Sequence, residues 1–323
     1  MSSKPKVYIT RKVPVEGVRL LAEHCEVTHW DREDAVPRVE LLKNVSGMDA
    51  LFCLLTEKVD AEVLNAAGPQ LKCVATMSVG YDHIDLAECK KRGISVGFTP
   101  DVLTNAVAEL TMALLLATSR RLKEGMNAVI QGKWGTWNPI WLLGSGLDGA
   151  TVGVVGLGRI GFEVVKRLHP FGVAKVLYSD VEPKSYAKDV NAEYATLDDL
   201  LKTSDFVLGC CALTKENMGL FNKDAFSKMK NTAIFVNTSR GGLVNQDDLY
   251  AALSTNQIAG AGLDVTNPEP LPTDSPLLKL ENCIVLPHIA SATIKSRSAM
   301  SELTGQNILA CLNGKKMPAQ VVV

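Results

Sequence analysis

The 323-residue sequence lacks a long hydrophobic run, a strong net charge and any pair of cysteines at metal-ligand spacing. The apolar run at residues 110–117 is far shorter than the roughly 20 residues that span a bilayer. Lys and Arg total 34 against 35 Asp and Glu, so the net charge of −1 excludes the basic surface typical of proteins that bind nucleic acid or anionic membranes. With 46% hydrophobic and 21% charged residues, the composition excludes disorder and is ordinary for a globular protein.

Targeting signals and metal-binding motifs are also missing. The basic N-terminal segment MSSKPKVYIT has no apolar signal core, and the chain ends in three valines, so we expect a cytoplasmic protein. The eight cysteines lie mostly inside apolar runs. We interpret them as small buried hydrophobic residues in a reducing compartment, with a reactive thiol as the alternative, and expect no metal.

Short apolar runs alternate with helical patterns along the chain, whose length is typical of about two domains. Strands that alternate with helices indicate parallel sheets with helices on both faces. The sequence therefore predicts two doubly wound α/β domains. The expected strands are residues 6–10, 25–30, 49–55, 71–76, 94–99, 151–156, 174–180, 205–211, 232–239, 258–265 and 282–287.

Two long helices and one unusual loop complete the predicted elements. Asp101 to Arg121 reads as a buried helix that Asp101 caps, and residues 293–311 read as a second long helix. Residues 131–149 have loop composition around three tryptophans. This loop either packs on its own domain or forms a subunit interface, where aromatic residues are enriched.

A glycine motif opens the second α/β run. Gly156, Gly158 and Gly161 form GxGxxG between an apolar strand and a helical pattern, and Asp180 ends the next strand. The glycines allow a tight turn, close approach of a pyrophosphate, and close helix–strand packing, while an acid at Asp180 binds ribose hydroxyls. The pattern predicts a dinucleotide site. Asp180 favours NAD, and Lys184 either contacts a phosphate or is a solvated surface residue.

Three further residues follow expected strands. Arg240, Glu269 and His288 each lie just past a strand end, where open parallel sheets bind ligands. Reduction of a ketone needs a proton donor such as His, a neighbouring carboxylate orients its ring, and Arg binds a substrate carboxylate with two hydrogen bonds. Each residue alone has a structural explanation, so the hypothesis rests on all three together with the glycine motif.

The sequence resembles the D-isomer-specific 2-hydroxyacid dehydrogenases over nearly its whole length. The motifs that carry the resemblance are VVGLGRIG, VNTSRGGLVNQDDL, AGLDVTNPEPLP and LPHIASAT. It is most similar to the glyoxylate reductase/hydroxypyruvate reductase branch, through TMSVGYDHIDL, RGISVGFTPDVLT, WNPIWLLGSGL and NILACLNGKKMP.

The resemblance implies a fold, a reaction and a set of site residues. A Rossmann nucleotide-binding domain (103–293) would be inserted into a flavodoxin-like substrate domain (1–102 and 294–323). The activity would be NAD(P)H-dependent reduction of small 2-oxo acids, glyoxylate to glycolate and hydroxypyruvate to D-glycerate, by a homodimer. The implied catalytic residues are His288 as proton donor, its partner Glu269 and the substrate-binding Arg240. The implied substrate-binding residues are Val79, Gly80, Arg240, His288, Ser291 and Trp137, with Trp137 reaching the neighbouring subunit's active site. The implied cofactor-binding residues are Gly156, Gly158, Arg159, Ile160, Gly161, Asp180, Ala212, Thr238, Asp264 and Ala290.

The cofactor and the exact substrate stay open at this point. Mammalian-type reductases of this branch favour NADPH and carry an arginine after the second strand, whereas this sequence has acids at Asp180 and Glu182. We therefore expect NADH to serve at least as well as NADPH. The alternatives are a dehydrogenase for another D-2-hydroxy acid, such as D-lactate or 3-phosphoglycerate, and a nucleotide-sensing corepressor-type binding protein. The absence of a C-terminal regulatory extension disfavours phosphoglycerate as the substrate.

Overall fold

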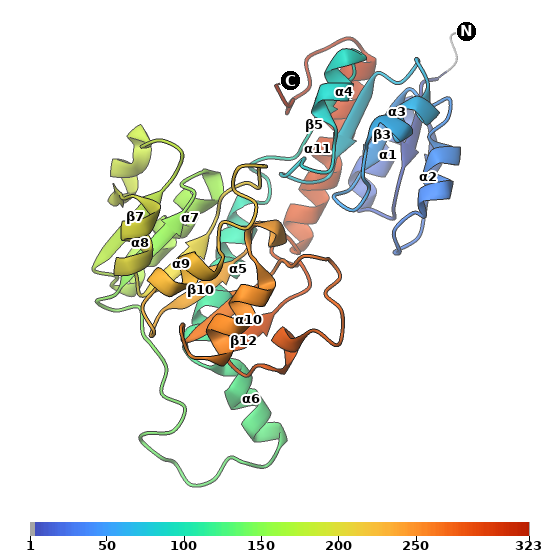
Figure 1. Cartoon of the computed structure of the whole chain (residues 1–323). Coiled ribbons are helices and arrows are strands. Elements are labelled where there is room, and N and C mark those ends of the chain that lie inside the picture. The colour runs from blue at the N-terminus through green and yellow to red at the C-terminus, as the bar shows by residue number, and fades with distance from the viewer. Residues whose placement is uncertain (1–3, 323) are drawn as a thin grey trace. The chain divides into compact units, whose positions relative to one another are not determined.

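The computed structural model describes residues 4–322 and divides into two compact units (Figure 1). The first unit comprises the chain up to Leu103 and from Ala292 onward, and the second comprises Thr104–Ser291. The sequence-based boundaries at residues 102 and 294 differ from these by one and two residues. Residues 1–3 and 323 lie outside the described residues. All four belong to the expected first domain, and residues 1–3 are also part of the N-terminal segment in which the sequence shows no signal core.

The first unit contains a five-stranded parallel sheet in the order β2-β1-β3-β4-β5, which is the flavodoxin-like order. Its strands are β1 (Lys6–Ile9), β2 (Glu26–His29), β3 (Ala50–Cys53), β4 (Cys73–Thr76) and β5 (Ser95–Gly97). Its helices are α1 (Val15–His24), α2 (Arg38–Asn44), α3 (Ala61–Ala67), α4 (Leu86–Lys91) and α11 (Ile294–Leu312).

The core of the first unit explains why the chain returns to it at the C-terminus. Leu41, Val63 and Cys89 bring α2, α3 and α4 into one buried cluster with strand residues such as Leu51 and Val74. The helix α11 packs against α1 and contacts β3, β4 and β5. Burial of apolar surface on both faces of the sheet therefore requires a helix from the far end of the sequence.

The second unit contains a seven-stranded parallel sheet in the order β12-β11-β10-β9-β6-β7-β8. If β6 is taken as the first strand, this is the Rossmann order extended by one strand, β12. The prediction of two doubly wound α/β domains is confirmed for both units. Its strands are β6 (Thr151–Val155), β7 (Lys175–Ser179), β8 (Ala192–Tyr194), β9 (Phe206–Gly209), β10 (Ile234–Asn237), β11 (Gly260–Leu263) and β12 (Cys283–Val285). Its α-helices are α5 (Thr104–Ser119), α6 (Leu122–Ile130), α7 (Arg159–Leu168), α8 (Leu197–Thr203), α9 (Lys223–Lys228) and α10 (Gln246–Ser254). Short 3₁₀ turns lie at His169–Phe171, Ser185–Val190, Gly241–Leu243 and Pro276–Lys279.

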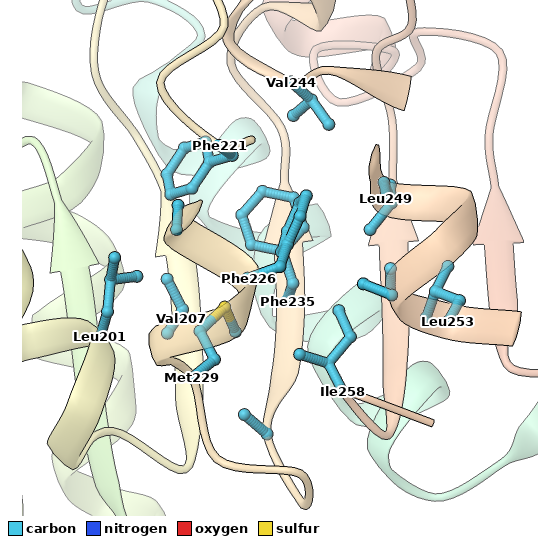
Figure 2. Packing of buried hydrophobic residues seen from close by; sticks show 14 of the residues in the cluster. Leu201, Val207, Phe221, Phe226, Met229, Phe235, Val244, Leu249, Leu253 and Ile258 are labelled. Carbon is cyan, nitrogen blue, oxygen red and sulfur yellow. The ribbon is translucent and has the colours of Figure 1, made fainter. Parts of the chain in front are cut away.

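Alternate residues of the central strands fill two cores, one on each face of this sheet. In β10, Phe235 belongs to the cluster with α8, α9 and α10, whereas Ile234 and Val236 belong to the cluster with α5 and α7. Figure 2 shows the first cluster, where Phe221 and Phe226 lie against Phe235 with ring centroids 4.7 and 5.7 Å away. Burial on both faces accounts for the continuous apolar runs of these strands.

The structure corrects two predicted elements. The helix expected from Asp101 to Arg121 begins at Thr104 and ends at Ser119. Asp101 lies outside the helix, because its backbone is left-handed (φ +69°) and a turn separates it from Thr104; its role as a cap stays a prediction. The edge strand β8 was not predicted, since three residues at a sheet edge carry too short a pattern. None of the helices between residues 4 and 322 combines the length and apolarity needed to cross a bilayer.

Candidate active site

Three neighbouring strands of the second unit carry the predicted catalytic residues. Arg240 follows β10, Glu269 follows β11 and His288 follows β12. These strands are adjacent and parallel, so their carboxyl ends meet at one edge of the sheet. Residues 19 or more positions apart in sequence are thereby gathered on a rigid support, as an active site requires.

Glu269 and His288 form a direct pair. His288 Nδ1 lies 2.8 Å from Glu269 Oε2, and the two side chains are 25% and 31% exposed. The other carboxylate oxygen, Oε1, accepts a hydrogen bond from the Thr266 amide at 2.9 Å. Because both carboxylate oxygens are bonded, Glu269 holds the imidazole ring by Nδ1 and leaves Nε2 as the nitrogen available to a ligand.

The pKa of Glu269 reflects this arrangement. Burial acts to raise it, but hydrogen bonds from His288 and the Thr266 amide, with the positive charges of His288 and Arg240, outweigh burial and lower the pKa below its usual value. A carboxylate with a lowered folded-state pKa stabilises the fold fully above its unfolded pKa, about 4.3, and loses that contribution as pH falls through the folded value.

Glu269→Gln is therefore expected to change how stability depends on pH. The free energy of unfolding of the wild type should exceed that of the variant at pH 7, and the difference should shrink below about pH 4.3. Urea unfolding of both proteins between pH 3 and pH 7 measures it, and titrating groups remote from residue 269 contribute equally to both proteins. A difference that stays constant over this range would contradict the lowered pKa.

Asp264 secures the loop that carries His288. Its backbone carbonyl accepts the His288 amide at 2.9 Å, and its carboxylate oxygens accept the amides of Ile289 and Ala290, each at 2.8 Å. His288 has a left-handed backbone (φ +55°), an uncommon conformation that these three bonds hold in place. The Asp264 side chain is fully buried, and burial raises its pKa despite the two amides that lower it.

The Arg240 loop is tied to the Glu269 loop by backbone contact. The buried Asn237 side chain donates to the Arg240 carbonyl at 2.9 Å and accepts the Ser239 amide at 3.0 Å, which shapes the turn. Gly241 packs so closely on the backbone of Thr266 that a Cβ would collide with the Thr266 carbonyl. Since the Thr266 amide bonds Glu269, this contact sets the Arg240 loop beside the loop that holds Glu269.

The glycine motif forms the turn between β6 and α7. A Cβ on Gly161 would collide with the Gly156 carbonyl, whereas one on Gly158 would meet nothing within 4 Å. Gly158 thus faces open space at the first turn of α7, where unpaired amides and the helix dipole favour an anion. This open place, which a side chain would fill, fits the pyrophosphate of a dinucleotide.

Asp180 and Lys184 lie beside this turn. Asp180 accepts the Leu157 amide at 2.9 Å through Oδ2, so it sits against the glycine turn as the dinucleotide pattern requires. Lys184 Nζ lies 3.5 Å from Asp180 Oδ1 and 3.4 Å from Glu182 Oε1, and its side chain is only 22% exposed. Lys184 is therefore a partly exposed lysine paired with two carboxylates, and its contact with a cofactor phosphate stays a prediction.

The remaining predicted cofactor residues of this unit lie near the same sheet edge. Arg159 and Ile160 open α7, Ala212 follows β9, and Thr238 follows β10. The Thr238 hydroxyl lies 2.7 Å from that of Thr111 on α5, in a buried position. Ala290 is buried, and its amide donates to the Asp264 carboxylate; Ser291 is half-buried. Their roles toward a ligand stay predictions.

In the first unit, Val79 and Gly80 lie in the turn Ser78–Asp82, just after β4. Both are partly exposed. The Ser78 carbonyl accepts the Thr99 amide at 2.9 Å, and the Gly80 carbonyl accepts the Ser78 hydroxyl at 2.6 Å. Within residues 4–322, no hydrogen bond engages the amide of Val79 or Gly80. Neighbouring amides without a protein partner can bind an anion, and this role of Val79 and Gly80 stays a prediction.

The tryptophan loop packs onto its own unit only at its C-terminal end, where the Ser145 amide donates to the Ser119 carbonyl at 2.9 Å and Leu147 is buried. Trp137 is 81% exposed and Trp134 is 68% exposed. Helix α6 and the loop that follows extend away from the sheet of the second unit (Figure 1). Helix α6 exposes the apolar residues Met126, Val129 and Ile130, and the loop exposes the apolar residues Ile140 and Leu143. Packing onto its own domain is therefore wrong for the part of the loop that carries Trp134 and Trp137, and the subunit interface stays a prediction.

Sequence reasoning missed several residues that shape the site. Asn237, Ser239 and Thr266 act through hydrogen bonds to neighbouring backbone, and only the folded turns reveal these partners. Their signal in the sequence is weak, because Asn, Ser and Thr are common in any turn. Among the described residues, no group of three or more His, Cys, Asp or Glu is placed to hold a metal ion.

Comparisons with known proteins show which family the chain is similar to. Residues 112–290 match the family model of the D-isomer specific 2-hydroxyacid dehydrogenase, NAD binding domain. The human glyoxylate reductase/hydroxypyruvate reductase is 52% identical over 319 residues, covering 98% of this chain and 97% of the relative. A crystal structure of a protein from Thermus thermophilus is similar with a TM-score of 0.91 and 43% identity, covering 98% of this chain and all of the other. The NADPH-dependent glyoxylate/hydroxypyruvate reductase from Sinorhizobium meliloti, solved with NADP and malonate, has a TM-score of 0.85 and 31% identity, covering 99% of this chain and 97% of its own. The chain therefore belongs to the D-isomer specific 2-hydroxyacid dehydrogenase family.

Proposed function

We propose that this protein is an oxidoreductase that reduces small 2-oxo acids with NADH or NADPH, converting glyoxylate to glycolate and hydroxypyruvate to D-glycerate. The observation that carries the proposal is the pair of His288 Nδ1 and Glu269 Oε2, 2.8 Å apart at the carboxyl edge of the sheet. The names of the human and Sinorhizobium meliloti relatives support the same reaction.

The cofactor site is built by residues of the second unit. The amides at the start of α7 and the open place beside Gly158 would hold the pyrophosphate, and Asp180 would bind the adenosine ribose. Ala212, Thr238, Asp264 and Ala290 would lie along the rest of the dinucleotide, and Asp264 would act near the nicotinamide. When bound, the dihydronicotinamide supplies the hydride that reduces the carbonyl carbon.

The side chains then have separate tasks. The amides of Val79 and Gly80 would bind the substrate carboxylate, Arg240 would orient the carboxylate and the carbonyl, and Ser291 would line the site. Protonated His288 would donate the Nε2 proton to the carbonyl oxygen, which becomes the hydroxyl of the product. Glu269 stabilises the imidazolium before transfer and orients the neutral ring after it. The balance is one 2-oxo acid, one NAD(P)H and one proton giving one 2-hydroxy acid and NAD(P)⁺.

An absorbance assay of NADH and NADPH oxidation tests the proposal. Glyoxylate and hydroxypyruvate should be turned over, with NADH giving a kcat/KM at least as high as NADPH, because the Asp180 carboxylate repels a 2′-phosphate. Asp180→Asn removes this charge at nearly constant shape and should shift the ratio toward NADPH. A strong NADPH preference of the wild type would contradict the role of Asp180.

The same assay separates the alternatives. Measuring kcat/KM for pyruvate and 3-phosphohydroxypyruvate as well tests whether D-lactate or 3-phosphoglycerate is the product instead. A nucleotide-sensing binding protein would bind NADH and show negligible turnover with every 2-oxo acid. The relatives' names and the residues available for proton transfer favour the enzyme.

The exposed apolar surface of α6 and the tryptophan loop is proposed as the interface of a homodimer. Exposed apolar residues clustered on one segment are typical of a subunit interface, and Trp137 is the proposed contributor to the neighbouring subunit's active site. Sedimentation equilibrium should give twice the chain's 34.8 kDa for the wild type. The triple variant Trp134→Ser, Trp137→Ser, Ile140→Ser should sediment as a monomer, and a monomeric wild type would contradict the proposal.

We also place the protein in the cytoplasm. All eight cysteines are free thiols, and five of them are buried, as expected for a protein of a reducing compartment.

A further inference from the structure

A chain of hydrogen-bonded side chains from Thr76, Ser78 and His83 flanks the turn Ser78–Asp82 and has no assigned role in the proposed reaction. The Thr76 hydroxyl lies 2.8 Å from the Ser78 hydroxyl and 3.1 Å from His83 Nε2. The Ser78 hydroxyl lies 2.6 Å from the Gly80 carbonyl. Thr76 and Ser78 are buried, so this chain is shielded from water.

The direction of every bond in this chain follows from counting protons. A carbonyl only accepts, so the single proton of Ser78 goes to the Gly80 carbonyl. Ser78 Oγ then accepts from Thr76, which uses the only proton of Thr76. Thr76 Oγ1 therefore accepts from His83, which carries its proton on Nε2. The chain runs from His83 through Thr76 and Ser78 to the Gly80 carbonyl.

This chain restrains the peptide planes around the proposed carboxylate-binding amides. The Ser78 carbonyl is bonded to the Thr99 amide, and since a trans peptide is planar, this bond fixes the direction of the Val79 amide. The bond from the Ser78 hydroxyl to the Gly80 carbonyl fixes the peptide between Gly80 and Tyr81. The peptide between Val79 and Gly80 is thus restrained on both sides, although Gly80 would otherwise leave the turn flexible.

We propose that Ser78, Thr76 and His83 are positioning residues that hold the amides of Val79 and Gly80 in the direction in which they bind a carboxylate. This inference rests on the proposed function, because it takes the substrate to be a 2-oxo acid. The three side chains act through the turn and do not touch the substrate. Amides fixed before binding lose less entropy when the anion arrives, so their loosening weakens carboxylate binding without changing the chemical step.

The test compares Thr76→Val with Thr76→Ser. Valine keeps the shape of threonine without the hydroxyl, so it interrupts the chain, whereas serine keeps the hydroxyl and should restore it. Ser78→Ala removes the link to the Gly80 carbonyl. Thr304→Val is the matched control, because the Thr304 hydroxyl is also buried in the first unit and, within residues 4–322, bonds only the Met300 carbonyl of its own helix.

The readouts are the dissociation constant of oxamate in the presence of NADH, by calorimetry, and the KM and kcat for glyoxylate. Ser78→Ala and Thr76→Val should weaken oxamate binding and raise KM about two- to tenfold, as loss of one hydrogen bond predicts, with kcat and the KM for NADH nearly unchanged. Thr76→Ser and Thr304→Val should bind oxamate like the wild type.

Two results would overturn the inference: unchanged oxamate binding in Ser78→Ala and Thr76→Val, or an equal rise in the KM for NADH, which would indicate general damage. A wild type that binds no oxamate would overturn it as well. A wild type that binds oxamate but reduces no 2-oxo acid would contradict the proposed function alone, because the binding measurement needs no turnover.

Discussion

Replacing His288 with alanine is expected to lower kcat for 2-oxo acid reduction by about 10²- to 10⁴-fold, the usual contribution of a positioned general acid. The reason is geometric as well as chemical. Glu269 bonds Nδ1 of the ring at 2.8 Å, so Nε2 is the only atom of His288 placed to give a proton to the substrate. Without it, the alkoxide that forms on reduction takes its proton from water.

The loop itself should survive this substitution. Asp264 holds the loop through the backbone amides of His288, Ile289 and Ala290, and these bonds do not involve the imidazole. NADH binding by the variant, measured by calorimetry, should therefore stay within a few-fold of the wild type. His24→Ala serves as a surface control, because His24 is exposed at the end of α1. Turnover by His288→Ala at the wild-type rate would remove His288 from the mechanism.

Gly161→Ala should lower the stability of the protein, whereas Gly158→Ala should leave it unchanged. A Cβ at Gly158 meets no protein atom within 4 Å, so Gly158→Ala should unfold like the wild type. It places a methyl group where the pyrophosphate would lie, and loss of an amide–phosphate hydrogen bond should weaken NADH binding roughly 10- to 100-fold. A Cβ at Gly161 collides with the Gly156 carbonyl, so Gly161→Ala should destabilise the protein by about 1–3 kcal/mol.

Two measurements on the same preparations check this pair. Thermal unfolding without cofactor should show a Tm drop of several degrees for Gly161→Ala alone, at about 2–4 °C per kcal/mol. Titration with NADH should show weakened binding in both variants. If Gly158→Ala bound NADH as tightly as the wild type, the pyrophosphate would not lie at the start of α7.

The sequence predicted the parts of the fold that depend on periodicity. Buried strands such as β10 read as apolar runs because both faces of the sheet are covered, and their order along the chain led to two doubly wound domains. Arg240, Glu269 and His288 were found for the same reason. A polar residue just past a buried parallel strand lies at the ligand-binding edge.

Features that depend on local backbone geometry were not predictable in this way. Asp is a residue type that commonly caps helices, and the sequence pattern therefore placed the start of the helix at Asp101. The left-handed backbone of Asp101 precedes a turn, and α5 begins only at Thr104. Lys184 resembles any surface lysine in the sequence, and only the fold pairs it with Asp180. The hydrogen-bond chain from His83 to Gly80 needs atomic positions, because its members are common residues at ordinary spacings.

The most direct measurement of the central claim follows a labelled hydride. NADH deuterated at both C4 positions is incubated with hydroxypyruvate and the wild-type protein, and the glycerate is examined for deuterium at C2 and for its configuration. The account predicts D-glycerate carrying one deuterium at C2. Glycerate without deuterium, glycerate of the L configuration, or no glycerate at all would contradict it.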